Sequence, residues 1–248
     1  MRRVLILGGT AEARALAAEL AGELAGGDTH VVSSLAGRVT NPRLPVGEVR
    51  EGGFGGPDGL AAWLTAERID AVVDATHPFA ARMTASAAEA SARTGVPLLI
   101  LRRPGWRESP DDAWRRVASL EEAAARLADM PVERVFLTTG RRSLPVFTGL
   151  SGVWLLARSV DPPDAPVPAN VQVLLDRGPY TVEGERSLIL EHRLDVLVTK
   201  DSGGEMTVAK LLAARELGLP VIMVDRPPPP PGVRAVDSVA VAAAWAQG

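Results

Sequence analysis

A short glycine-rich segment follows the first apolar run of the chain, Val4–Leu7. It is compatible with the dinucleotide-binding fingerprint if Gly8 takes the first glycine position, Thr10 replaces the second and Ala13 takes the third. Backbone N–H groups at the start of the next helix would then face a phosphate. An ordinary tight connection between a strand and a helix has similar residues, so both interpretations stay open. The candidate cofactor contacts here are Gly8, Gly9, Thr10, Glu12 and Ala13.

The second predicted strand, His30–Ser34, ends in hydroxyl groups and not in a carboxylate. A cofactor that lacks a 2′-phosphate usually meets an acidic residue near this place, which accepts a hydrogen bond from the ribose. Here Ser33 and Ser34 are followed by Arg38, and a guanidinium offers two parallel donors to a phosphate dianion. These three residues favour a cofactor with a phosphorylated ribose. The alternative is an ordinary polar loop.

The third predicted strand is followed by a histidine that precedes a proline. Pro78 keeps His77 out of the helical region and starts a helix behind it. His77 would then stand at the edge of a ligand site, where an imidazole can donate to a carboxylate or move a proton. A structural role for this histidine is an equal alternative. Thr76 is a further candidate cofactor contact, and His77 and Phe79 are candidate substrate contacts.

Basic, hydroxyl and aromatic groups also follow the later predicted strands, where open parallel sheets bind ligands. Trp106 suits stacking on a flat ligand or capping of the core. Only two of the 27 basic residues are lysines; we expect Lys200, before a glycine-rich loop, to bind an anionic group and Lys210 to be a solvated surface charge. The candidate substrate contacts in this group are Arg103, Trp106, Thr139, Gly140, Arg141, Arg158, Tyr180, Lys200, Asp201, Ser202 and Gly203.

The elements that would position these side chains alternate between short β-branched runs and alanine-rich amphipathic stretches. This alternation is typical of parallel α/β sheets. It predicts strands at 4–7, 30–34, 69–74, 98–101, 135–138, 153–157, 171–174, 196–199 and 221–224, with short segments at 114–117 and beside the glycine-rich stretch 52–56. It predicts helices at 11–24, 60–66, 79–93, 120–128, 183–192, 207–217 and 239–246.

Ten or more strands are too many for one sheet, so we expect two sheets of four to six strands each. The predicted fold class is α/β, with two Rossmann-like parallel-sheet domains at residues 1–117 and 118–248 and the ligands in a cleft between them. A large polyanionic ligand would suit the basic groups from both domains. The proline run Pro227–Pro231 is interpreted as a polyproline connector to the last helix.

The composition argues against several classes of protein. The 248 residues are 46% hydrophobic and 23% charged, which is enough apolar material for a buried core. The formal net charge of −3 gives no basic field of the kind that nucleic-acid-binding proteins show. The absence of cysteine excludes disulfides and thiolate metal sites, and we expect no bound metal. The first apolar run is too short to cross a membrane, so a cytoplasmic location is expected.

Seven motifs, in this order and spacing, resemble those of the precorrin-6A reductase family of cobalamin biosynthesis: GGTAEAR, SSLAGR, DATHPFA, RPGW, TTGR, RGPY and VTKDSGG. The resemblance covers the chain from Val4 to about Pro227, and DATHPF and TKDSGG are its most specific elements. It implies two Rossmann-like domains and NADPH-dependent reduction of a double bond in the precorrin-6A macrocycle, which gives precorrin-6B. The tetrapyrrole is then the substrate and NADPH/NADP the cofactor, with His77 and Lys200 as candidate catalytic residues.

Two alternatives stay open beside this resemblance. One is a cobalt-precorrin-6A reductase of the anaerobic route, in which the substrate and not the protein carries the metal. The loop from Ser33 to Arg38 favours NADPH and the metal-free route. The other is a non-catalytic nucleotide- or tetrapyrrole-binding module, which would bind the macrocycle without oxidising NADPH.

Overall fold

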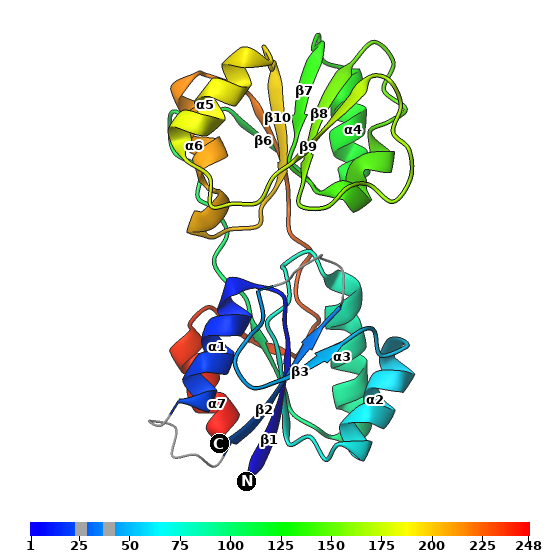
Figure 1. Ribbon diagram of the computed structural model, residues 1–248, viewed down its shortest axis with the longest axis vertical. Helices are drawn as coiled ribbons and strands as arrows, with labels where there is room; N and C mark the ends of the chain where they lie inside the picture. Colours follow the sequence, from blue (N-terminus) through cyan, green and yellow to red (C-terminus); the bar gives the residue numbers. More distant parts are fainter. Residues whose placement is uncertain (23–28, 37–42) are drawn as a thin grey trace. The chain divides into compact units, whose positions relative to one another are not determined.

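The chain folds into two compact units, which are described separately (Figure 1). The computed structural model describes residues 1–22, 29–36 and 43–248. Unit 1 comprises Met1–Pro104 and Pro227–Gly248, and unit 2 comprises Gly105–Arg226. Each unit is built on a six-stranded sheet in which every pair of neighbouring strands is parallel. The expected α/β class with two Rossmann-like sheets is confirmed.

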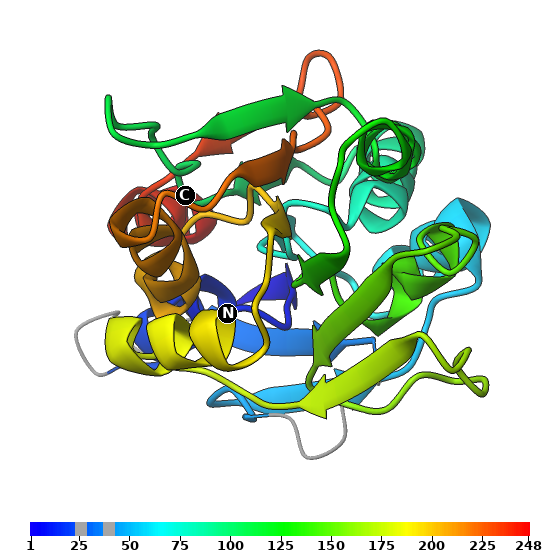
Figure 2. The ribbon, with the colours of Figure 1, turned by 90° about the horizontal axis from the view of Figure 1, so that it is seen from above.

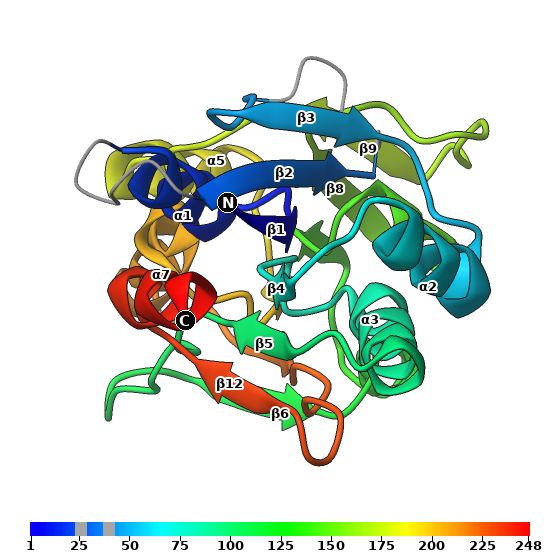
Figure 3. The same ribbon diagram turned by 90° about the horizontal axis from the view of Figure 1, so that it is seen from below.

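Unit 1 has the strand order of a dinucleotide-binding fold. Its strands, in spatial order, are β3 (Glu48–Glu51), β2 (Thr29–Leu35), β1 (Arg2–Leu7), β4 (Ala71–Asp74), β5 (Leu98–Leu101) and β12 (Arg234–Val236), as Figure 3 shows. Numbered along the unit, this is the order 3-2-1-4-5-6. The order reverses between β1 and β4, and such a switch point is where open α/β sheets bind ligands.

Helices cover both faces of the sheet in unit 1, because its strands are apolar on both sides. Val4 and Ile6 of β1 pack with α1 (Ala11–Ala21) and α7 (Val239–Gln247) on one face. Leu5 and Leu7 pack with α2 (Gly56–Ala66) and α3 (Ala81–Thr94) on the other face. Successive side chains of a strand alternate between faces, so the apolar run predicted from the sequence fills two cores at once.

Unit 2 repeats this architecture (Figure 2). Its strands, in spatial order, are β6 (Trp114–Val117), β11 (Val221–Val224), β10 (Val196–Lys200), β7 (Arg134–Leu137), β8 (Trp154–Ser159) and β9 (Val171–Leu175). Helices α5 (Val182–Glu191) and α6 (Ala209–Glu216) cover one face, and α4 (Leu120–Ala128) with the 3-10 segment η2 (Arg141–Val146) covers the other (Figure 1). A second 3-10 segment, η3 (Glu205–Thr207), precedes α6. The switch point of this sheet lies between β10 and β7.

The domain limits expected from the sequence, 1–117 and 118–248, differ from the structure. Strand β6, expected in the first domain, pairs with β11 of unit 2, and Trp114 lies opposite Val221. After Arg226 the chain returns to unit 1, where β12 pairs with β5 and α7 packs against α1. The periodicity of a segment identifies a strand but not the strand that pairs with it. The chain passes from unit 1 to unit 2 and back again, so a single domain boundary could not describe it.

No helix in the described part of the chain is long and apolar enough to cross a lipid bilayer.

Candidate functional site

The glycine-rich turn after β1 lies at the switch point of unit 1 and is bonded to both neighbouring strands. The backbone N–H of Gly8 donates to the carbonyl oxygen of Ser34 in β2 at 2.9 Å. On the other side, Thr10 Oγ1 donates to the carbonyl oxygen of Ala75, directly after β4, at 2.7 Å. The turn is therefore held in a fixed position between the ends of β2 and β4.

The same turn presents an open backbone at the start of α1. Thr10 caps this helix, because its Oγ1 accepts from the N–H of Ala13 at 3.1 Å. Gly9 has a φ of 109°, and a Cβ placed there would meet no atom within 4 Å. The first turn of α1 carries Glu12, whose carboxylate pairs with Arg103 at 2.9 Å. The open backbone and the helix start suit the binding of a phosphate group. The side chains of Glu12 and Arg103, both predicted ligand contacts, form an ion pair with each other.

The end of β2 carries the two serines predicted from the sequence, both buried. The hydroxyl of Ser33 has no hydrogen-bond partner among the described atoms. Ser34 Oγ accepts at 3.1 Å from Arg50, a half-buried residue of β3 that the sequence analysis missed. The register between β2 and β3, which places Arg50 opposite Ser34, is the signal that would have found it. Arg38 lies outside the described residues.

The segment after β4 forms a compact turn. Asp74 is buried, and its Oδ1 accepts from Thr76 N at 3.0 Å and from Thr76 Oγ1 at 2.6 Å. Among the described atoms, Asp74 Oδ2 has no hydrogen-bond partner. The imidazole of His77 is exposed, and its Nδ1 accepts from Phe79 N at 3.2 Å. Thr76, His77 and Phe79 therefore lie together at the carboxyl end of β4, as predicted.

A pocket of about 360 Å³ lies in unit 1 beside the ends of β4 and β5. Asp74, Thr76, His77 and Arg102 contribute to its lining, and the proline run Pro227–Pro231 forms part of its wall. The prolines do connect β11 to β12, as expected of a linker, but they also shape a cavity at the switch point. A five-membered ring at each position makes this wall rigid.

In unit 2, Lys200 joins the two strands of the switch point. Its Nζ donates to the carbonyl oxygen of Thr139 at 2.7 Å and to Ser143 Oγ at 3.2 Å. Burial, and secondarily the charge of Arg142, lowers the pKa of Lys200 from 10.5 to about 8. The ammonium is therefore mostly protonated at neutral pH and lies at the carboxyl end of β10.

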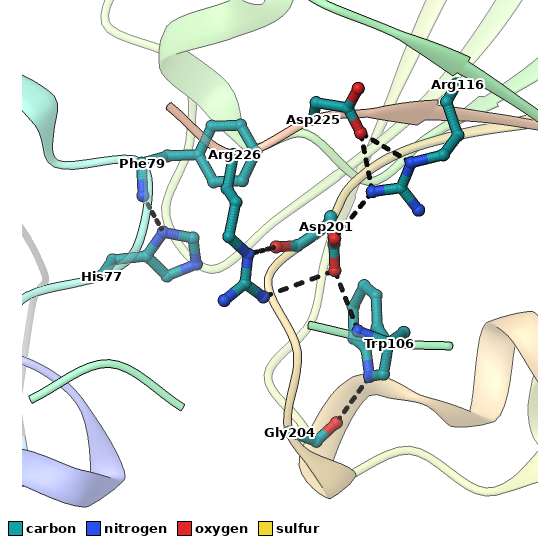
Figure 4. A network of polar contacts seen from close by, with 8 residues as sticks. All are labelled: His77, Phe79, Trp106, Arg116, Asp201, Gly204, Asp225 and Arg226. Carbon is teal, nitrogen blue, oxygen red and sulfur yellow. Dashed lines mark hydrogen bonds and ion pairs between the residues drawn. The ribbon is translucent and has the colours of Figure 1, made fainter. Parts of the chain in front are cut away.

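The next residue, Asp201, is the centre of a network that Figure 4 shows. Its buried carboxylate accepts from the backbone N–H of Trp106 at 3.0 Å, from Arg116 Nη2 at 2.9 Å and from Arg226 Nη2 at 3.4 Å. The indole of Trp106 also donates to the carbonyl oxygen of Gly204 at 2.9 Å. This carboxylate thus holds the first and last segments of unit 2 together.

Arg158 lies in a buried cluster on the side of α5 and α6. Its Nη1 pairs with Glu185 at 2.8 Å, and its guanidinium stacks on the ring of Tyr180 at 3.7 Å. The expectation that Lys210 is a solvated surface charge is wrong. It is only 4% exposed, donates to the carbonyl oxygen of Thr207, and lies 4.8 Å from the ring centre of Trp106. Five of the eight residues of α6 are buried, and Lys210 is one of them.

The remaining predicted residues of unit 2 lie at the same edge of the sheet. Arg141 donates to Asp164 at 2.9 Å, and the N–H of Ser202 donates to the carbonyl oxygen of Lys200 at 2.6 Å. Four predicted residues line one cavity of about 10 Å³, which is the size that holds a single water: Thr139, Gly140, Arg141 and Arg158. The structure therefore brings the loops after β7, β8 and β10 together, with Gly203 buried among them.

The comparisons with known proteins agree with this fold. The chain matches the family model described as "Precorrin-6x reductase CbiJ/CobK" over residues 3–247. A protein named precorrin-6A reductase from Rhodococcus erythropolis is 56% identical over 245 residues, which are 99% of this chain and 97% of the relative. One of the same name from Mycobacterium tuberculosis is 53% identical over 249 residues, covering 100% and 98% of the two chains.

More distant relatives include a protein named cobalt-precorrin-6A reductase from Priestia megaterium, 33% identical over 90% of each chain. The solved structure named CobK precorrin-6A reductase superposes with a TM-score of 0.88, at 41% identity, over 99% of this chain and 96% of that one. From its sequence and its fold, the chain belongs to the precorrin-6x reductase family, a family of oxidoreductases.

Proposed function

We propose that this protein reduces a double bond of the precorrin-6A macrocycle with NADPH and releases precorrin-6B. Family membership supports the reaction and the tetrapyrrole substrate. The observation that supports a dinucleotide cofactor is the turn at the switch point of unit 1, where Gly9 leaves the backbone open and Thr10 fixes the start of α1. NADPH, when bound, supplies the hydride.

The residues of unit 1 fit this cofactor in the following way. The backbone of Gly8, Gly9 and Thr10, with the first N–H groups of α1, binds the pyrophosphate. Ala13 packs against the turn, since its Cβ lies 3.5 Å from where a Cβ at Gly8 would be. Thr76, on the other side of the switch point, contacts the cofactor from the end of β4. The end of β2, beside which the ribose of the cofactor would lie, carries Ser33 and Ser34 and no carboxylate, so it would not repel a 2′-phosphate.

The substrate carries several acetate and propionate carboxylates, which need cations and N–H donors. Lys200 offers a protonated ammonium whose position is set by Thr139 and Ser143. His77 offers an exposed imidazole that can donate to a carboxylate or supply a proton. The other proposed substrate contacts are Phe79, Arg103, Trp106, Gly140, Arg141, Arg158, Tyr180, Ser202 and Gly203.

Incubation of the purified protein with precorrin-6A and either NADPH or NADH tests this proposal. We expect NADPH absorbance to fall only when the macrocycle is present, and the product to be two hydrogens heavier than the substrate. Binding of the macrocycle without oxidation of either cofactor would instead indicate a binding module. Turnover of the cobalt-loaded macrocycle alone would assign the protein to the anaerobic route.

A further inference from the structure

Arg50 is a half-buried arginine at the carboxyl end of the parallel strands β2 and β3. Its Nη1 donates to Ser34 Oγ at 3.1 Å and to the carbonyl oxygen of Gly52 at 2.9 Å. Its Nη2 donates to the carbonyl oxygen of Gly53 at 2.9 Å, and the ring centre of Phe54 lies 3.7 Å from Cζ. The guanidinium is thus fixed on one face by an aromatic ring and along its edges by neutral oxygens.

The charge of Arg50 is not balanced by a carboxylate within the described residues. Glu48, on the same strand, pairs with His30 at 2.8 Å. By contrast, Arg103 pairs with Glu12 and Arg158 pairs with Glu185. Burial lowers the pKa of Arg50, which reflects the cost of keeping an unbalanced cation away from water. An anion bound beside this guanidinium would supply the missing charge.

Acceptors in the described part of the chain engage only some of the N–H donors of Arg50. A guanidinium has five N–H groups, and three hydrogen bonds reach acceptors in the described part of the chain. The remaining donors can bind a phosphate dianion, which accepts from two N–H groups in parallel. Ser34 Oγ, which accepts from Arg50, can donate its own proton to the same phosphate.

The location of Arg50 determines which phosphate this would be. The carbonyl oxygen of Ser34 accepts a hydrogen bond from Gly8 of the glycine-rich turn after β1. In the 3-2-1-4-5-6 fold the end of the second strand lies beside the ribose of the cofactor, where a residue distinguishes a 2′-hydroxyl from a 2′-phosphate. We infer that Arg50, with Ser34, recognises the 2′-phosphate of NADPH and excludes NADH. This inference rests on the proposed use of NADPH and adds the residues that select it.

Binding of cofactors to the full-length protein without macrocycle tests the inference independently of turnover. Isothermal titration gives dissociation constants for NADPH, NADH and the fragment 2′,5′-ADP. Arg50→Gln should weaken NADPH and 2′,5′-ADP by about 10- to 100-fold and change NADH by less than about twofold. Arg50→Lys keeps the charge without the paired donors, so it should retain only part of the affinity.

The chain offers a matched control in Arg134 of unit 2. It also lies on a strand, stacks on an aromatic ring (Trp154, 4.0 Å) and donates to a backbone carbonyl. Arg134→Gln should change the affinity for neither cofactor. A crystal structure of the unmodified protein with 2′,5′-ADP checks the position directly, and its 2′-phosphate should lie against Arg50 even if the variants fold poorly.

These measurements distinguish a wrong cofactor from a wrong assignment to Arg50. If the unmodified protein binds NADPH and NADH equally, the proposed cofactor is wrong and the inference falls with it. If the unmodified protein prefers NADPH and Arg50→Gln keeps that preference, only the assignment to Arg50 is overturned. A 2′-phosphate located away from Arg50 in the crystal would overturn it in the same way.

Discussion

Replacing Asp201 by alanine should lower the free energy of unfolding by about 3 kcal/mol. The side chain is 6% exposed and accepts three hydrogen bonds within unit 2. The bonds from Trp106 N (3.0 Å) and Arg116 Nη2 (2.9 Å) are short, whereas the 3.4 Å contact with Arg226 is long and weak. Two strong bonds to a buried carboxylate are therefore lost in the variant.

The expected loss in the free energy of unfolding depends on which acceptors Arg116 and Arg226 keep in the variant. Breaking a buried ion pair costs about 3–5 kcal/mol when a charge is left unpaired. Here Arg116 is 39% exposed and keeps Asp225 at 2.6 Å, and Arg226 keeps the backbone oxygen of Asp201 at 3.1 Å. Neither guanidinium is left without an acceptor, so we place the loss at the lower end of that range. Asp201→Asn, which keeps an acceptor for Trp106 N, should lose about half as much.

Urea unfolding followed by far-UV circular dichroism measures these differences. Asp225→Ala is the matched control, because Asp225 is 45% exposed and also pairs with Arg116. A partly exposed ion pair contributes about 1 kcal/mol or less. If Asp201→Ala is no less stable than Asp225→Ala, the carboxylate does not hold the ends of unit 2 as argued.

Three further predictions concern the other titratable residues. Burial, and secondarily the charge of Arg158, lowers the pKa of Lys210 from 10.5 to about 7, so between pH 7 and 10.5 the unfolded chain binds a proton that the folded chain does not. The free energy of unfolding should therefore rise with pH across that window and rise less in Lys210→Met, and equal slopes would contradict this. His77→Ala should lower turnover with little change in Tm, because the imidazole is exposed; a large fall in Tm with normal turnover would indicate a structural role. Lys200→Ala should weaken precorrin-6A binding by about 1.5–3 kcal/mol, and in the unmodified protein KM should rise as pH passes 8; an unchanged KM in the variant would remove Lys200 from the site.

Local signals in the sequence predicted most elements, because each depends on residues close together in the chain. The limits of α4 (Leu120–Ala128) and β11 (Val221–Val224) match the prediction residue for residue. The predicted strand ends at Ser34, Asp74 and Thr199 lie within one residue of the observed ends, which is why the candidate residues fall at the switch points.

What the sequence could not provide is the pairing between distant segments. β12 has only three residues and was not predicted, since its stability comes from pairing with β5. Arg50 was missed because its significance depends on the register between β2 and β3. Asp201 precedes Gly203 and Gly204 in a pattern typical of ligand-binding loops, yet its hydrogen-bond partners Trp106 and Arg226 are 95 and 25 residues away.

The return of the chain to unit 1 after Arg226 has a consequence for the order in which the protein forms during synthesis. Unit 2 is one continuous segment, so all of its strands are present once Arg226 has left the ribosome. Unit 1 begins first but lacks β12 (Arg234–Val236) and α7 (Val239–Gln247) until these segments are made, and α7 covers the same face of the sheet as α1. Domains usually complete in order from the amino terminus. Here the inserted unit can finish first, and the nascent unit 1 carries a partly uncovered sheet face and an open edge on β5 until β12 and α7 have been made.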